Sequence, residues 1–299
     1  MLALVGILVV IGSVATGYLM HGGNILLLFQ PNEYIIIGGA ALGALLVGSP
    51  LSVVKAVFAG IANFTKPGPS KKDYLDLLVM LYELLSIARR EGALALESHV
   101  EEPEKSEILR RYPSFLKNHH AVHFFTDTLR LFVSGALTDP HDLENLMDVD
   151  LETHHIESSK PHRALQTMGD ALPGLGIVAA VLGIVLTMQA IGGPPNEIGE
   201  KVGAALVGTF LGVLLSYGFA QPLALNLASQ AENSARYSGA IKQVLLGFAR
   251  GSVPAVAVEF ARRSLPSDVR PGYAELEQAC KAGKAAAKAA AGSVAAATA

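Results

Sequence analysis

The chain has 299 residues, of which 51% are hydrophobic and only 16% are charged, against roughly 25% charged residues in a typical soluble domain. The mean hydropathy of +0.40 is typical of a polytopic membrane protein, and the formal net charge of −3 excludes an overall basic nucleic-acid binder. A single cysteine, Cys280, excludes a disulfide framework and an all-cysteine metal site.

Segments without charged residues predict four transmembrane helices, since about 20 apolar residues cross the hydrocarbon core of a bilayer. A polar break, Gln30-Pro31-Asn32-Glu33, separates the first two helices. No basic residue precedes Lys55, so the first segment is expected to be a retained helix and not a cleaved signal peptide. The predicted spans are residues 2–20, 34–54, 172–191 and 202–225.

The distribution of basic residues predicts the orientation of these spans, because lysine and arginine are enriched in cytoplasmic loops. Thirteen of the 23 lie from Lys55 to Arg163 and nine from Arg236 to Lys288, which leaves only Lys201 between the third and fourth helices. Both termini and the long middle segment are therefore expected in the cytoplasm. The predicted organisation is a transmembrane hairpin (1–54), a cytoplasmic helical domain (55–170), a second transmembrane hairpin (171–228), a cytoplasmic helical region (229–278) and an Ala/Lys-rich tail that is frayed or disordered (279–299).

Helical periodicity continues through the middle segment. Leucines at 75, 78, 81 and 85 predict a helix over 74–100, and further helices are expected over 115–135 and 140–158. Asp139-Pro140 resembles an N-cap followed by a first-turn proline. No alternating strand pattern competes with these helices. The predicted fold class is an all-α polytopic membrane protein with a large helical cytoplasmic domain between its second and third transmembrane helices.

Small residues recur every four positions on the fourth predicted helix, and they allow neighbouring backbones to approach closely. The stripe consists of Ala204, Gly208, Gly212 and Ser216. Either the stripe packs against another helix of the same four-helix bundle, or it packs against a central partner or the axis of an oligomer. Thr209, Ser216 and Tyr217 add hydroxyl groups, whose ordinary alternative role is to bond back to the backbone of their own helix. Pro173 and Pro222 permit hinges, and a simple helix-end role is the alternative.

None of the four predicted spans contains an Asp, Glu, Lys or Arg at mid-membrane depth, although an ion pathway through hydrocarbon normally needs an ionisable group. Another chain would have to supply the carboxylate. Asp170, at the cytoplasmic mouth of the third helix, is the nearest candidate here, and its ordinary role would be to offset the dipole at the helix N-terminus. His119, His120 and His123 have metal-like spacing, but a solvated helix face explains them, so no metal site is expected. The absence of a phosphate-binding loop excludes direct use of ATP, and no enzymatic activity is expected.

Six short segments, dispersed along the chain, resemble a known family in the same order and topology. They are Gly17–Met20, Gln30-Pro31, Glu102–Glu107, Gly169–Pro173, Val207–Gly212 and Ala257–Phe260. The chain resembles the MotA family of flagellar stator subunits, in the MotA/TolQ/ExbB proton channel superfamily. The resemblance implies five copies in the bacterial inner membrane around a dimer of MotB, whose transmembrane aspartate carries the ion. It implies no cofactor, and torque applied to the rotor protein FliG through charged contacts.

The resemblance also assigns roles to single residues. Arg89, Gly92 and Glu97 match the family's rotor contact, and the doubled Arg90 shares or takes the role of Arg89. Pro173 and Pro222 match prolines that couple ion binding to movement. Positions near the channel are matched by Thr209, Ala180 and Tyr217.

The transported ion is expected to be a proton. Sodium needs several oxygen ligands, and Ala180 stands where sodium-driven relatives typically carry a threonine. Thr209 alone is too few ligands. A sodium-driven stator and an ExbB/TolQ-like energiser of outer-membrane processes remain alternatives, although the hairpin over 2–54 weighs against the latter. A self-sufficient transporter would show two similar halves and its own charged site, and a structural membrane scaffold is the remaining class.

Overall fold

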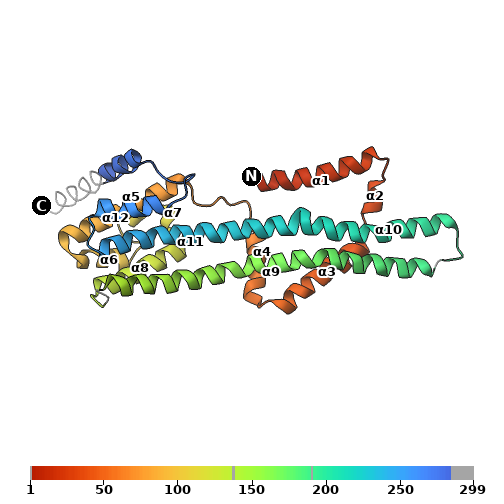
Figure 1. The fold of residues 1–299 in the computed structure, drawn as a ribbon, viewed down its shortest axis with the longest axis horizontal. Helices are drawn as coiled ribbons and strands as arrows, with labels where there is room; N and C mark the ends of the chain where they lie inside the picture. The colour runs from red at the N-terminus through yellow and green to blue at the C-terminus, as the bar shows by residue number, and fades with distance from the viewer. Residues whose placement is uncertain (1, 137–138, 190, 284–299) are drawn as a thin grey trace. The chain divides into compact units, whose positions relative to one another are not determined.

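A computed structural model describes residues 2–136, 139–189 and 191–283 (Figure 1). Helices make up the fold, and no strand occurs in these three ranges, which confirms the all-α fold class. The chain divides into two compact units, one made of residues 1–66 and 157–231 and the other of residues 67–156 and 232–299. The tail predicted over 279–299 falls, beyond residue 283, outside the described residues.

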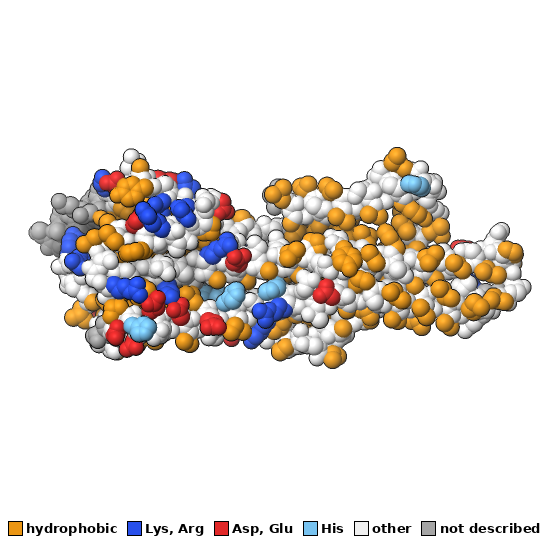
Figure 2. All heavy atoms as spheres, viewed as in Figure 1, with side chains coloured by type: hydrophobic (Ala, Val, Ile, Leu, Met, Phe, Trp, Pro, Cys, Tyr) orange, Lys and Arg blue, Asp and Glu red, His pale blue; other side chains and the backbone are white. Residues whose placement is uncertain are grey.

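The first unit contains the apolar helices, and four helical stretches among the described residues are long and apolar enough to cross a membrane. This number agrees with the four predicted spans. In Figure 2 hydrophobic side chains dominate the visible face of these helices. The elements are α1 (Leu2–Met20), α2 (Ile25–Leu28), α3 (Pro31–Gly48), α4 (Leu51–Ala62), the later part of α9 (Pro140–Met188), α10 (Pro195–Val213), the π-helix η3 (Leu214–Ala220) and the beginning of α11 (Gln221–Ala249).

Prolines explain why the second span differs from its prediction. Helix α3 begins at Pro31, whose missing N–H costs nothing in a first turn. It ends at Gly48, because Pro50 disfavours helical backbone at Ser49, which is extended. The predicted range of 34–54 is therefore wrong at both ends. Residues after Pro50 form the separate helix α4.

Helix α9 is longer than predicted, because it runs without a break from Pro140 to Met188. The predicted separate helix over 140–158 is the beginning of α9, and the third predicted span is its end. The predicted N-cap is confirmed: the backbone N–H of His141 donates to Asp139 Oδ1 at 2.8 Å. The fourth predicted span is likewise part of a longer helical stretch, Pro195–Ala249.

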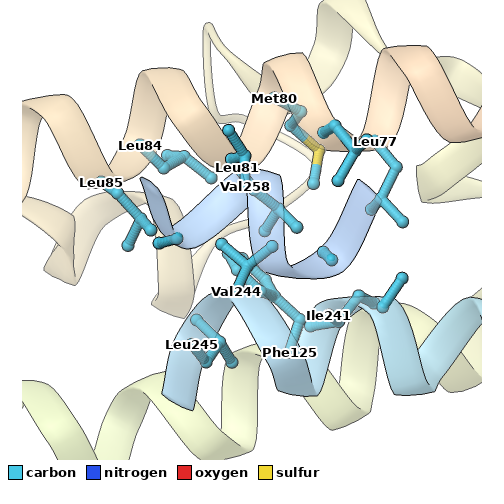
Figure 3. Close-up of a cluster of buried hydrophobic side chains, with 14 of the residues drawn as sticks. Leu77, Met80, Leu81, Leu84, Leu85, Phe125, Ile241, Val244, Leu245 and Val258 are labelled. Carbon is cyan, nitrogen blue, oxygen red and sulfur yellow. The ribbon is translucent and has the colours of Figure 1, made fainter. Parts of the chain in front are cut away.

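The second unit is a helical domain with one large hydrophobic core. Leucines of α5 and Met80 meet Ile241, Val244 and Leu245 of α11, with Val258 of α12 and Phe125 of α8 beside them (Figure 3). The elements are α5 (Lys71–Glu91), η1 (Ala93–Leu96), α6 (Glu97–Glu101), η2 (Leu109–Arg111), α7 (Pro113–Leu116), α8 (His119–Val133), the first part of α9, the last part of α11 and α12 (Pro254–Ser264). Residues 273–283 are also helical.

Helix α5 has clear start and stop signals. Ser70 and Asp73 form a capping box, in which Asp73 N–H donates to Ser70 Oγ and Ser70 N–H donates to Asp73 Oδ2. The helix ends at Glu91, and the residue that follows it, Gly92, has a φ of +90°, which favours glycine. The predicted helix over 74–100 is therefore interrupted at Gly92, and its remainder forms η1 and α6.

The histidines of α8 are only partly the solvated face that the sequence predicts. His119 and His123 are exposed. The ring of His120 stacks on that of His154, with centroids 3.3 Å apart, and its Nε2 is buried without a hydrogen-bond partner in the part of the chain described. Burial lowers the pKa of His120. No group of three metal-binding side chains is found among the described residues.

Candidate functional site

Glycines bring α9 and α10 into backbone contact. A Cβ atom on Gly176 would lie 2.8 Å from Gly208 O, and one on Gly212 would lie 2.6 Å from Leu172 O. Real Cβ atoms essentially never approach this closely, so these positions require glycine. Gly208 and Gly212 are buried by this contact and Ala204 is half-buried. Packing within the chain's own hairpin, one of the two alternatives above, therefore accounts for Gly208 and Gly212.

The hydroxyl groups predicted on one face of the fourth span lie in different environments. Ser216 is completely buried, and its Oγ has no hydrogen-bond partner in the described ranges, so it does not bond back to its helix. Thr209 is half-buried, whereas Tyr217 is 61% exposed. Ala180 is buried, and its backbone N would lie 3.1 Å from a Cβ on Gly208. Ala180 of α9 and Thr209 of α10 therefore lie at the same level of the hairpin.

Pro173 and Pro222 both lie inside long helical stretches, so the helix-end alternative is wrong for them. Pro173 is an interior residue of α9. Pro222 is the second residue of α11, which follows η3 directly, so it also interrupts a continuous helical stretch. A proline cannot donate an N–H to the carbonyl four residues earlier, and its ring crowds that carbonyl. The wider turns of the π-helix before Pro222 are a local irregularity that often marks functional sites.

Asp170 links the two long helices. Its Oδ1 accepts hydrogen bonds from Gln166 Nε2 and from Gln221 Nε2, both at 3.0 Å. The carboxylate is exposed and lies thirty residues inside α9, so its predicted alternative role at a helix N-terminus is wrong. Its second partner, Gln221, precedes Pro222 directly.

Glu33 is the residue that the sequence analysis missed. It was assigned to a polar break, but α3 begins at Pro31 and includes it in the first turn. Glu33 is only 7% exposed, and its Oε2 has no hydrogen-bond partner within the described part of the chain. A Cβ on Gly208 would lie 2.6 Å from that oxygen. The preference of proline for the first helical turn could have placed Glu33 in the helix, but no local signal indicates its burial.

The predicted rotor contact lies in the second unit, on an exposed segment. Arg89 and Arg90 occupy the last turn of α5, and Glu97 begins α6 after the turn at Gly92. Arg89 forms no ion pair within the described ranges. Arg90 is held weakly: its Nη2 is 3.6 Å from Glu91 Oε1, and its Nε donates to Ser86 O at 3.3 Å. The structure thus leaves these charges open to solvent, while their role stays a prediction.

A buried ion pair anchors the same helix on its inner side. Glu83 of α5 has a side chain only 2% exposed, and Arg111 forms a salt bridge to its Oε2. Tyr112 Oη donates to Glu83 Oε1 at 3.2 Å. The pair joins α5 to the segment of η2, and it fixes the helix that carries Arg89 and Arg90.

Replacing Glu83 with alanine should destabilise the second unit. Removing one partner of a fully buried ion pair costs about 3–5 kcal/mol. Because the Arg111 side chain is 36% exposed, we expect a loss of about 2–3 kcal/mol. The thermal unfolding midpoint of the intact chain in detergent measures the effect. Glu102→Ala, which removes an exposed partner of Lys105, is the matched control, and equal midpoints for the two variants would contradict the assignment.

Two family models match the chain in separate ranges. Residues 4–92 match the family described as Motility protein A N-terminal, and residues 117–238 match the MotA/TolQ/ExbB proton channel family. Motility protein A of Salmonella typhimurium is 41% identical over 94% of this chain and 96% of its own length. That of Escherichia coli is 40% identical, covering 95% and 96%. Chemotaxis protein LafT of Vibrio parahaemolyticus is 36% identical, covering 91% and 96%.

Two solved structures share the fold. The MotAB structure from C. jejuni superposes with a TM-score of 0.72 at 21% identity, covering 89% of this chain and 95% of that one. The flagellar MotAB stator complex from Bacillus subtilis gives a TM-score of 0.69 at 22% identity, covering 88% and 95%. The similarity therefore includes both the apolar helices and the helical domain.

Proposed function

Since the chain belongs to the motility protein A family, within the MotA/TolQ/ExbB proton channel family, we propose that it is an ion-conducting stator subunit of the bacterial flagellar motor. In this role it couples proton flow with MotB to torque on the rotor protein FliG. The observation that carries the proposal is similarity over 94% of the chain, which covers both the glycine-packed hairpin and the exposed charges at Arg89, Arg90 and Glu97. The family is one of channel subunits and not of enzymes.

The assembly follows from the same proposal. Five copies surround a MotB dimer in the bacterial inner membrane, with both termini in the cytoplasm. Two observations support it: the basic residues are almost absent from the two short loops, and α1 has no buried residue. The match of residues 4–92 to the motility protein A N-terminal family favours this role over an ExbB/TolQ-like energiser.

A proton is the ion that the hairpin fits best. Ala180 is buried and has no side-chain oxygen, and Thr209 at the same level provides one hydroxyl. Selective sodium binding needs several oxygens to replace the water shell, whereas a proton needs one carboxyl group and a chain of water molecules. MotB would supply the principal carboxylate.

Complementation of a deletion strain tests the proposal. Cells without the gene should have intact but paralysed flagella, and the wild-type gene should restore swimming in sodium-free potassium buffer. A protonophore should then stop the cells, because it removes the proton gradient. Swimming that fails without sodium but survives the protonophore would contradict proton coupling. Normal swimming of the deletion strain, under conditions in which no second stator is expressed, would contradict the stator role.

A further inference from the structure

The carboxyl group of Glu33 is buried, and one of its two oxygens has no hydrogen-bond partner among the described residues. The residue is 7% exposed, and within the described ranges no donor reaches its Oε2. Burial without a hydrogen-bond partner penalises the ionised form of a carboxyl group, so such a place favours the neutral form. Gly208 provides the space for the carboxyl group, since a Cβ there would lie 2.6 Å from Oε2.

The position along α10 places this carboxyl group inside the predicted span. Gly208 is six residues after Val202, where the fourth predicted span begins, and Glu33 lies within the apolar stretch Ile25–Gly48. At 1.5 Å per residue the separation from Val202 along the helix is about 9 Å, roughly a third of a hydrocarbon core about 30 Å thick. Ionisable groups at such depth are rare and mark ion pathways.

Glu33 does not form the capping box that is usual for a glutamate at its position in a helix. Glu33 is the third residue of α3, where a glutamate commonly closes a capping box with the N-cap residue. Here the N-cap is Gln30, whose side chain forms no cap, and the Glu33 side chain forms no hydrogen bond with the backbone N–H of Gln30. A capping box therefore does not explain why a carboxyl group is buried at this position.

Among the described residues of α9 and α10, no charged side chain forms an ion pair with Glu33. On α10, Glu197, Glu200 and Lys201 are exposed, and Lys201 lies seven residues, about 10 Å, before Gly208. On α9, Asp170 lies ten residues from Ala180 and is bonded to glutamines. Other titratable groups of the apolar helices in the first unit are Tyr18, His21, Tyr34, Lys55 and Tyr217, and Glu33 forms no ion pair in the described part of the chain.

We propose that Glu33 is a proton-binding site of this subunit inside the membrane. The carboxyl group is protonated in the packing described here, and it releases its proton to water when water reaches it. The carboxylate takes a proton back from water when the site closes. The participation of Glu33 in ion flow rests on the proposed stator function. The binding of a proton by Glu33 does not depend on rotation.

Infrared spectroscopy of the full chain with MotB in lipid tests the site directly. The wild type should show the C=O stretching band of a protonated carboxyl group, and the band should shift in D2O and disappear as the pH is raised. Glu33→Gln, which keeps the side-chain volume, should lose this component, and Glu33→Asp should retain one at a changed frequency. Glu200→Gln, an exposed acid of α10, is the matched control and should leave the band unchanged. An identical pH-dependent band in Glu33→Gln and the wild type would overturn the proposal.

The dependence of swimming speed on external pH provides the second measurement. Glu33→Gln should swim more slowly than the wild type and lose part of the pH dependence, while Glu33→Asp restores it in part. A Glu33→Gln profile that overlaps the wild-type profile would overturn the participation of Glu33 in ion flow. Failure of the stator role itself would appear in the wild-type complementation, and the infrared result does not depend on it.

Discussion

Replacing Gly212 with leucine should separate α9 from α10 and abolish motility. Even a Cβ at this position would lie 2.6 Å from Leu172 O and 2.8 Å from Gly176 Cα. Both are backbone atoms of a continuous helix and cannot turn away as a flexible side chain could. Overpacking of a core costs typically about 1–3 kcal/mol, and we expect a larger loss here because the whole leucine side chain meets backbone.

The measurement combines copurification of MotB, thermal stability of the detergent-solubilised complex and swimming. Gly174→Leu is the matched control, since a Cβ on Gly174 meets no atom of this chain within 4 Å and the residue is exposed on the same helix pair. Gly212→Ala should give an intermediate loss. Wild-type yield of MotB together with normal swimming in Gly212→Leu would show that the close approach of the two helices is dispensable.

Reversing both arginines at the end of α5, Arg89→Glu with Arg90→Glu, should abolish rotation while the chain still inserts and assembles. Both side chains are exposed, and exposed substitutions usually change stability by less than about 0.5 kcal/mol. Two acidic residues in the last turn also oppose the helix dipole, at about 0.3–1 kcal/mol each. Neither loss unfolds a domain with this core, so the effect should be on the proposed contact with FliG.

Localisation of the fluorescently labelled stator at the motor separates assembly from torque. Arg110→Glu, another exposed arginine of the second unit without an ion pair among the described residues, is the control and should swim normally. A compensating charge reversal on FliG should restore part of the motility. If no reversal rescues a double variant that still assembles at the motor, the contact does not depend on charge complementarity.

Local sequence signals predicted the helices well where nothing interrupts them. Helix α1 has the predicted bounds because an apolar run fills it from end to end. The interruptions at Pro50 and Gly92 were also readable, since proline disfavours helix at the preceding residue and glycine accepts a positive φ. Helix α9 shows the opposite case, because Pro161 and Pro173 lie inside it without ending it. Packing against other helices outweighs the local preference there.

The candidate site was predictable only in part. The four-residue spacing of small side chains identified Gly208 and Gly212, because that spacing places them on one helix face. The burial of Glu33 depends on contact between α3 and α10, which are far apart in the sequence. No periodicity within either helix contains that information. The prediction relied on the count of charged residues along the chain, and it therefore placed Glu33 in a loop between two helices.

The π-helix η3 sets the rotational register between α10 and α11. Its turns hold more than the 3.6 residues of an α-helical turn, because each carbonyl bonds the N–H five residues on. Moving such a widened turn along the helix by one position rotates each residue that it passes by about 100° around the axis. Ser216 lies within η3, and Pro222 lies directly beyond it. A one-position shift of η3 would therefore change the azimuth of the side chains that it passes in a discrete step, whereas Gly208 and Gly212 lie before η3 on the face that contacts α9.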